Sequence, residues 1–70
     1  MKKYLIVIEE TGSGYTAYSP DLPGCVASGW TRSEVEQRIR HSLAIHLESL
    51  RQFGELLPEP RSFPTFIELP

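Results

Sequence analysis

The first apolar segment of the chain predicts a β-strand with apolar side chains on both faces. Lys3 to Glu9 is rich in β-branched residues, and the turn-forming run from Thr11 to Gly14 ends it. One face carries Tyr4, Ile6 and Ile8, and the other carries Leu5 and Val7. A strand with one solvated face would alternate apolar and polar residues, so we predict a central strand covered on both sides.

Two further short strands are predicted before the middle of the chain. Tyr15 to Ser19 returns as the second strand of a hairpin, whose loop contains Gly12 and Gly14, both able to take positive φ. Pro20 to Gly24 is a rigid connection, because its two prolines fix φ and remove backbone donors. Cys25 to Gly29, a short run of mostly small residues, is the predicted third strand.

The middle of the chain predicts one long helix. Thr31 fits the N-cap of a capping box with Glu34, and the helix should run to about Phe53 and stop at Gly54. The stripe that falls on one helical face consists of Val35, Ile39, Leu43, His46, Leu47, Leu50 and Phe53. This face is predicted to pack on the sheet.

After the helix, three prolines predict an extended segment, and Thr65 to Leu69 predicts a last strand. The fold class is therefore α+β, a two-layer β-β-β-α-β arrangement with one helix packed on one face, and residues 1–70 form one domain. One helix covers only one face of a sheet. We therefore expect the uncovered apolar face, with Ile45 from the helix, to contact another copy of the chain or a different protein.

Composition and charge exclude several classes of function. The net charge of −2, with 40% apolar and 23% charged residues, is typical of a folded globular protein and disfavours a general nucleic-acid binder. The negative net charge suits a basic partner better than a nucleic acid. Cys25 is the one cysteine, which leaves no internal disulfide or cysteine-based zinc site and favours a cytoplasmic setting. The apolar run Tyr4 to Ile8 is too short for a signal peptide, and no stretch has the length of a membrane span.

Several segments, in order along nearly the whole chain, resemble the HicB-like antitoxins. Tyr15 to Gly29, read as YTAYSPDLPGCVASG, is similar to the signature segment of that family. The Thr-X-X-Glu helix start, the helix segment His46-Leu-Glu-Ser-Leu50 and the GELLPEP run from Gly54 to Pro60 are similar too.

The resemblance implies both a fold and a partner. The implied fold is a partial ribonuclease-H-like sheet of three antiparallel strands, a helix, and a fourth strand beside the first, which makes the first strand central. Family members are oligomeric and neutralise HicA, a small basic toxin that cleaves RNA with a histidine of its own. Many carry a C-terminal DNA-binding domain. This sequence ends at Pro70, so we expect no direct DNA binding, and short members of the family can lack a HicA partner.

Catalysis has little support in the sequence. A ribonuclease-H site needs several carboxylates that converge on divalent metals. The acidic residues are Glu9, Glu10, Asp21, Glu34, Glu36, Glu48, Glu55, Glu59 and Glu68. None is predicted to lie on an inward strand position beside a second acid. Asp21 is a candidate partner contact or a remnant of a metal site, but the favoured interpretation is that it accepts hydrogen bonds from nearby loop amides.

The other chemically interesting residues also have ordinary structural explanations. His46 is expected to be a buried, hydrogen-bonded histidine, and His41 lies too far around the helix to share a metal with it. Cys25 is expected to be a small packing residue. The arginines alternate with glutamates, which is typical of a solvated face. The three aromatic residues Trp30, Tyr18 and Tyr15 remain open as either core or interface anchors.

The sequence thus predicts a non-catalytic binding protein, with no cofactor and no metal. It is a HicB-type antitoxin or an orphan relative, assembled as a dimer or tetramer, with a HicA-like ribonuclease as its possible partner. The predicted partner contacts are Glu9, Glu10, Asp21, Leu22, Pro23, Gly24 and Cys25. One alternative is a metal-dependent nuclease on the same fold, and another is a structural homo-oligomer that binds an unrelated ligand between its subunits.

Overall fold

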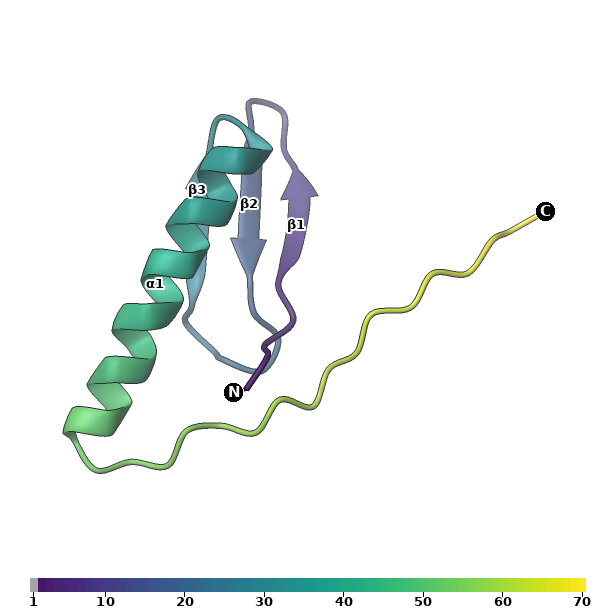
Figure 1. Cartoon of the computed structure of the whole chain (residues 1–70). Helices are drawn as coiled ribbons and strands as arrows, with labels where there is room; N and C mark the ends of the chain where they lie inside the picture. Colours follow the sequence, from purple (N-terminus) through teal and green to yellow (C-terminus); the bar gives the residue numbers. More distant parts are fainter. Residues whose placement is uncertain (1) are drawn as a thin grey trace.

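Short apolar segments separated by turn residues form an antiparallel sheet, and one long amphipathic segment forms a helix against it. The computed structural model describes residues 2–70, and Met1, the first residue of the predicted domain, lies outside this range. Its elements are β1 (Val7–Glu10), β2 (Tyr15–Tyr18), β3 (Val26–Gly29) and α1 (Arg32–Gln52). The strand order is β1-β2-β3, and α1 lies on one face of the sheet (Figure 1). The predicted two-layer α+β class is confirmed.

The first strand is shorter than predicted because its partner strand β2 is short. Val7 pairs with Tyr18, and Pro20 follows almost at once, so the residues before Val7 have no partner strand. Neither hairpin glycine takes the positive φ that glycine allows. Gly14 is instead needed for a close approach, because a Cβ there would collide with the carbonyl oxygen of Gly29.

Helix α1 begins and ends as the sequence predicts. The Oγ1 of Thr31 accepts a hydrogen bond from the backbone N of Glu34 at 3.1 Å, which satisfies one of the free amides of the first turn. The Glu34 carboxylate accepts from the backbone N of Trp30 at 3.0 Å, one residue before the cap itself. At the other end Phe53 is the C-cap, and Gly54 has φ 71°, the left-handed conformation that glycine adopts without strain.

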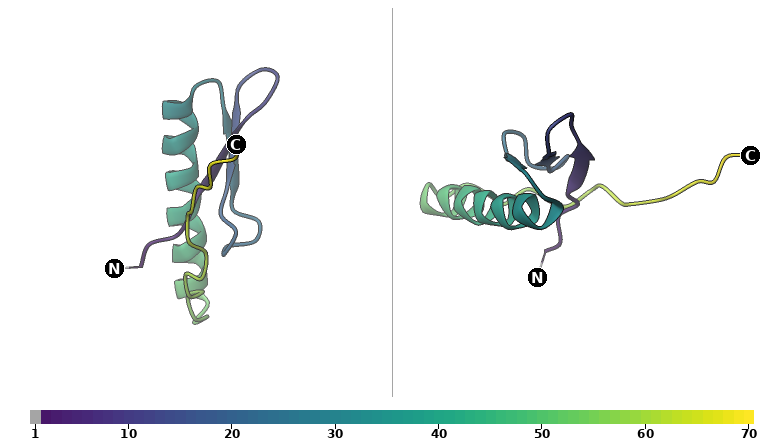
Figure 2. Two further views of the ribbon diagram at one scale, coloured as in Figure 1. Left: turned by 90° about the vertical axis from the view of Figure 1, so that its right-hand side faces the viewer. Right: turned by 90° about the horizontal axis from the view of Figure 1, so that it is seen from above.

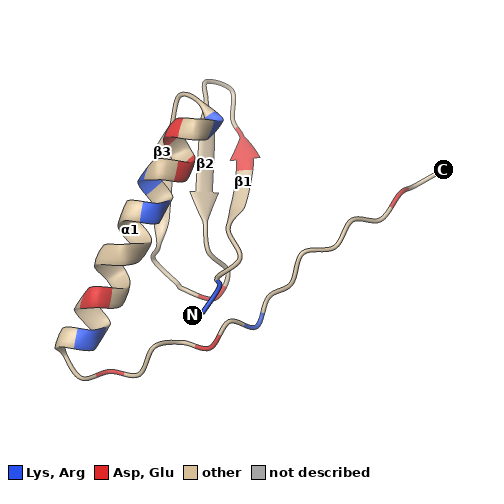
Figure 3. Cartoon of the chain, in the orientation of Figure 1, with Lys and Arg blue, Asp and Glu red and all other residues tan. Residues whose placement is uncertain are grey.

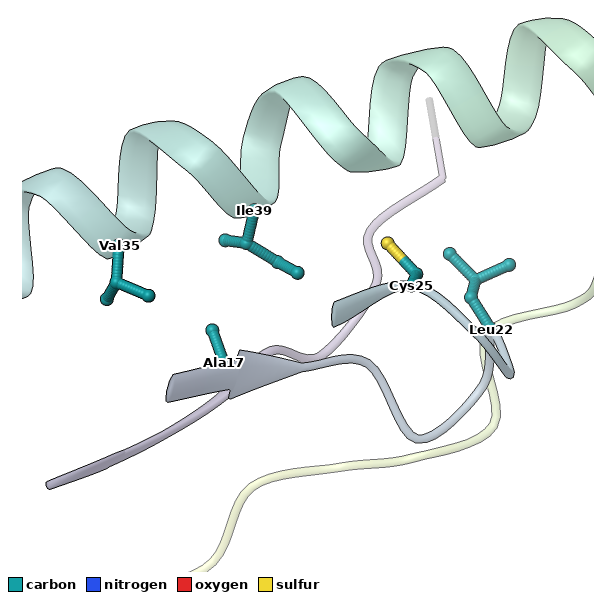
Figure 4. Packing of buried hydrophobic residues seen from close by; sticks show 5 residues of the cluster. All are labelled: Ala17, Leu22, Cys25, Val35 and Ile39. Carbon is teal, nitrogen blue, oxygen red and sulfur yellow. The ribbon is translucent and has the colours of Figure 1, made fainter. Parts of the chain in front are cut away.

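The core lies between α1 and the inner face of the sheet, and it is small. Figure 4 shows its buried apolar members, which are Ala17, Leu22, Cys25, Val35 and Ile39. Leu43 and Leu47 continue the helical stripe at its margin. The stripe prediction is wrong for Phe53, which is 79% exposed, because α1 continues past the end of the sheet (Figure 1).

The predicted fourth strand does not form in the described chain. Residues 54–70 form an extended tail that first passes the base of the sheet and then leaves the body, and Phe66 is 96% exposed (Figures 1 and 2). A strand needs a neighbouring strand to satisfy its backbone groups, and Thr65 to Leu69 has none here. The prediction that the first strand is central is therefore wrong, because β1 is an edge strand in this chain.

Candidate functional site

The face of the sheet that α1 leaves uncovered carries a row of apolar side chains. Ala17 is buried on the inner face, so its neighbours Thr16 and Tyr18 project outward. The register pairs Val7 with Tyr18 and Tyr18 with Val26, so these three side chains form one row across the sheet. Tyr18 is 38% and Val26 is 63% exposed. The sheet thus has an open apolar outer face, as the sequence predicts.

The next row on the same face is polar. Glu9 pairs with Thr16, and Thr16 pairs with Ser28. Figure 3 shows that the end of β1 is acidic, and Glu9 and Glu10 are both exposed there. An apolar centre beside a polar, charged rim is the usual composition of a protein–protein interface.

The loop that connects β2 to β3 is built around buried apolar residues. Leu22 is 0% and Cys25 is 3% exposed, and burial raises the pKa of the Cys25 thiol. The loop closes on itself through backbone bonds from Leu22 N to Ser19 O at 3.2 Å and from Cys25 N to Leu22 O at 3.1 Å. The side chains of Leu22 and Cys25 therefore serve the core, while Pro23 and Gly24 are exposed.

Asp21, in the same loop, holds the tail. One carboxylate oxygen accepts hydrogen bonds from the backbone N of Arg61 at 3.0 Å and of Ser62 at 3.1 Å, and the other accepts from the Ser62 hydroxyl at 3.0 Å. The amide of Arg61, helped by both Ser62 groups, holds the pKa of the Asp21 carboxyl below its usual value. Asp21 accepts amide hydrogen bonds, as predicted. The prediction that the donors lie in its own loop is wrong, because they lie 40 and 41 residues away.

Two further contacts support this attachment. The Tyr4 hydroxyl donates to the Pro58 carbonyl oxygen at 2.6 Å, and the Lys2 Nζ lies 2.7 Å from an oxygen of the Glu59 carboxylate. The tail is therefore fixed to the body over its first half, from Pro58 to Ser62.

The predicted partner contacts fall into two separate groups. Glu9 and Glu10 lie at the end of β1 that pairs with the start of β2. The loop from Asp21 to Cys25 follows the end of β2, at the opposite end of the same hairpin. The structure does not bring the two groups together. Contact with a partner stays a prediction for the exposed residues of both groups.

The histidines and acids form no candidate metal centre in the part of the chain that the structure describes. No group of three potential ligands comes together among residues 2–70. The prediction that His46 is buried is wrong, since its side chain is only half-buried, and His41 is exposed. Of the aromatic residues that the sequence left open, Tyr15 packs against the core, whereas Trp30 is 71% exposed.

Sequence reasoning missed two features of this surface. The outer row depends on strand register, and only the alternation around Ala17 hints that Tyr18 points outward. The hydrogen bonds between Asp21 and Ser62 join residues 41 positions apart and leave no local signal in the sequence.

Fold and surface together define a small two-layer α+β domain whose sheet leaves one apolar face uncovered. None of the helices within residues 2–70 is long and apolar enough to cross a membrane. The model of the HicB-like antitoxins of bacterial toxin-antitoxin systems matches residues 4–70. The chain belongs to this family.

Similar chains occur in a solved toxin-antitoxin complex and in two curated proteins. A chain in the solved structure of the HicA3 and HicB3 toxin-antitoxin complex is similar, with a TM-score of 0.71 and 34% identity over 87% of this chain and 71% of that one. An uncharacterised 14.9 kDa protein of Haemophilus phage HP1 is 33% identical over 96% of this chain, which spans 50% of the phage protein. A UPF0150 protein of Thermoplasma acidophilum is 33% identical over 80% of this chain and 83% of its own length.

Proposed function

We propose that this protein is a non-catalytic antitoxin that binds and blocks a HicA-like ribonuclease in the cytoplasm. The observation that supports it most is the match to a chain of the HicA3 and HicB3 complex, at an identity high enough to share more than the fold. We further propose that it acts as a homo-oligomer, as the resemblance to the family implies.

The outer face of the sheet is the surface we assign to the toxin. It offers the apolar row of Val7, Tyr18 and Val26 next to the carboxylate of Glu9. The toxin that the resemblance implies is small and basic, so an acidic rim complements its charge and steers the encounter. Exposed apolar side chains beside that rim supply the contact that excludes water.

The nuclease alternative gains nothing from the geometry. Metal-dependent cleavage of RNA requires several carboxylates around the reacting phosphate. Over residues 2–70 no three candidate ligands converge, and Asp21 already binds the tail. We do not propose this activity.

An inhibition assay tests the proposal. The protein is added to a HicA-family toxin, taken from the neighbouring reading frame if that frame encodes a small basic protein, and RNA cleavage is followed over time. We expect cleavage to stop at a stoichiometric ratio of the two proteins. Cleavage of RNA by this protein alone with Mg²⁺, or unchanged toxin activity in its presence, would contradict the proposal.

Two variants locate the surface. Val26→Asp places a charge in the centre of the apolar row, and we expect the Kd for the toxin to rise at least about tenfold, as for an interface hot spot. Leu56→Asp is the matched control, because Leu56 is 93% exposed and lies outside the sheet. Equal affinity of the two variants would show that the toxin binds elsewhere.

A further inference from the structure

The edge of the sheet at β1 is open. Over the described residues β1 pairs with β2 alone, so the backbone N–H and C=O groups on its other side have no strand partner. An open edge of this kind is a template for another strand.

The open edge continues into an apolar groove. Helix α1 lies over β3 and β2 rather than over β1. A groove of about 360 Å³ therefore remains between β1 and α1, with Ile6 and Ile8 on one wall and Ile39 and Leu43 on the other. Its rim is formed by Arg32, Glu36 and Arg40. The groove is shaped for the apolar side chains of a strand placed beside β1.

The second half of the tail carries suitable side chains and leaves them in solvent. Beyond Ser62, the exposed fractions are 83% for Phe63, 96% for Phe66, 79% for Ile67 and 85% for Leu69. The Cα radius of gyration is 13.6 Å, against about 11 Å for a compact chain of this length. This part of the tail is thus an extended apolar segment that covers no surface of its own chain in this structure (Figure 2).

The attachment of the tail directs it outward. Asp21 fixes the backbone at Arg61 and Ser62, and Pro64 follows two residues later. Proline fixes its own φ and restricts the preceding Phe63 to extended conformations, so the chain leaves the anchor in an extended conformation. Seven extended residues then reach up to about 23 Å from the anchor, more than the length of β1.

We propose that the tail of one copy pairs with the β1 edge of a second copy, and that the exchange is reciprocal. Residues 65–69 become the fourth strand of the partner's sheet. Alternation puts Glu68 on the face opposite Ile67 and Leu69, and a carboxylate is costly to bury without a partner. Ile67 and Leu69 therefore enter the groove, and Phe66 extends the outer row beside Val7.

The reciprocal exchange makes each contact twice. In each copy Ile67 and Leu69 of the partner fill the groove, the backbone of residues 65–69 pairs with β1, and Phe66 packs beside Val7 at the outer face. A stable dimer needs about 1,200–2,000 Å² of buried surface, and the doubled strand and side-chain contacts contribute toward that area. A reciprocal contact also closes with twofold symmetry and does not propagate into fibres. This inference rests on the homo-oligomer in the proposed function and specifies its interface.

Light scattering coupled to size exclusion tests the exchange on the intact chain. We expect a dimer at about 10 μM that Ile67→Asp converts to a monomer, with at least a tenfold increase in the dimer Kd. Glu68→Gln, the matched control on the other face of the same strand, remains a dimer. Leu69→Asp, on the same face as Ile67, repeats the test if Ile67→Asp precipitates. Because no toxin is present, failure of toxin inhibition leaves this result unaffected.

Hydrogen exchange of the β1 amides distinguishes a tail that pairs with a second copy from other arrangements. We expect these amides to be protected in the dimer and to lose protection in Ile67→Asp. A monomer with protected β1 amides would mean that the tail folds back on its own sheet, and it would overturn the proposal. A dimer that persists in Ile67→Asp would place the interface elsewhere and would overturn it as well.

Discussion

A mutation of Leu22 tests whether the loop from Asp21 to Cys25, which the sequence predicts to contact a partner, belongs to the core instead. The Leu22 side chain is 0% exposed and joins the buried cluster between the loop and α1 (Figure 4). Leu22→Ala removes this packing and leaves a cavity that the surrounding structure fills only in part. We expect a loss of about 2–4 kcal/mol in the free energy of unfolding, toward the lower part of the range for buried leucine because the core is small.

That loss is a large share of the total stability. A chain of 70 residues has roughly 4–10 kcal/mol of unfolding free energy. At about 4–8 °C per kcal/mol for a domain of this size, the Tm should fall by at least about 8 °C. Urea unfolding followed by circular dichroism measures the free energy, and a thermal scan measures the Tm.

Leu56→Ala is the control with the same chemical change. Leu56 is 93% exposed, so its truncation removes little buried surface, and we expect a change below about 0.5 kcal/mol. If both variants unfold at the same urea concentration, Leu22 is not a core residue. The loop would then again be a candidate contact surface.

Three further predictions concern the turn, the helix start and the tail. Gly14→Ala should cost about 1–3 kcal/mol in urea unfolding because its Cβ meets the Gly29 backbone, whereas Gly12→Ala, with nothing within 4 Å, should cost less than 1; equal costs would contradict the close approach. Thr31→Ala should cost about 1 kcal/mol by the same assay, and an unchanged midpoint would mean that the cap adds no stability. The depressed pKa of Asp21 means that tail attachment is fully present above its usual value of 3.8 and is lost as pH falls through the lower folded value. NMR should show the Ser62 amide shifting in that acid range, and Asp21→Asn should abolish the shift; a shift that survives in Asp21→Asn would assign the titration to another group.

The parts of the fold that depend on local sequence were predictable. The N-cap at Thr31 and the stop at Gly54 are set by residues within a few positions of each other, and the structure places both where the pattern does. The inward stripe is correct where the sheet lies beneath the helix. It fails at Phe53, since the sequence does not reveal where the sheet ends.

The parts that depend on distant pairing were not predictable. Leu22 lies in a proline-bounded loop, where local reasoning expects exposure, yet the loop folds over the end of the core. Thr65 to Leu69 has the composition of a strand, but a strand forms only where an edge accepts it. The candidate contacts were chosen from sequence motifs, which do not show strand register. The register puts Glu9 and the Asp21 loop at different ends of the hairpin.

The hydrogen bonds from Arg61 and Ser62 to Asp21 also imply an order of folding. The hairpin and α1 form from residues close in sequence, whereas this contact closes a loop of about 40 residues, whose entropy must be lost before any bond forms. We therefore expect the anchor to form late, on a sheet and helix that already exist. The anchor does not cover the apolar end of the chain, so this end can meet neighbouring molecules before and after the anchor forms, and assembly competes with aggregation throughout folding.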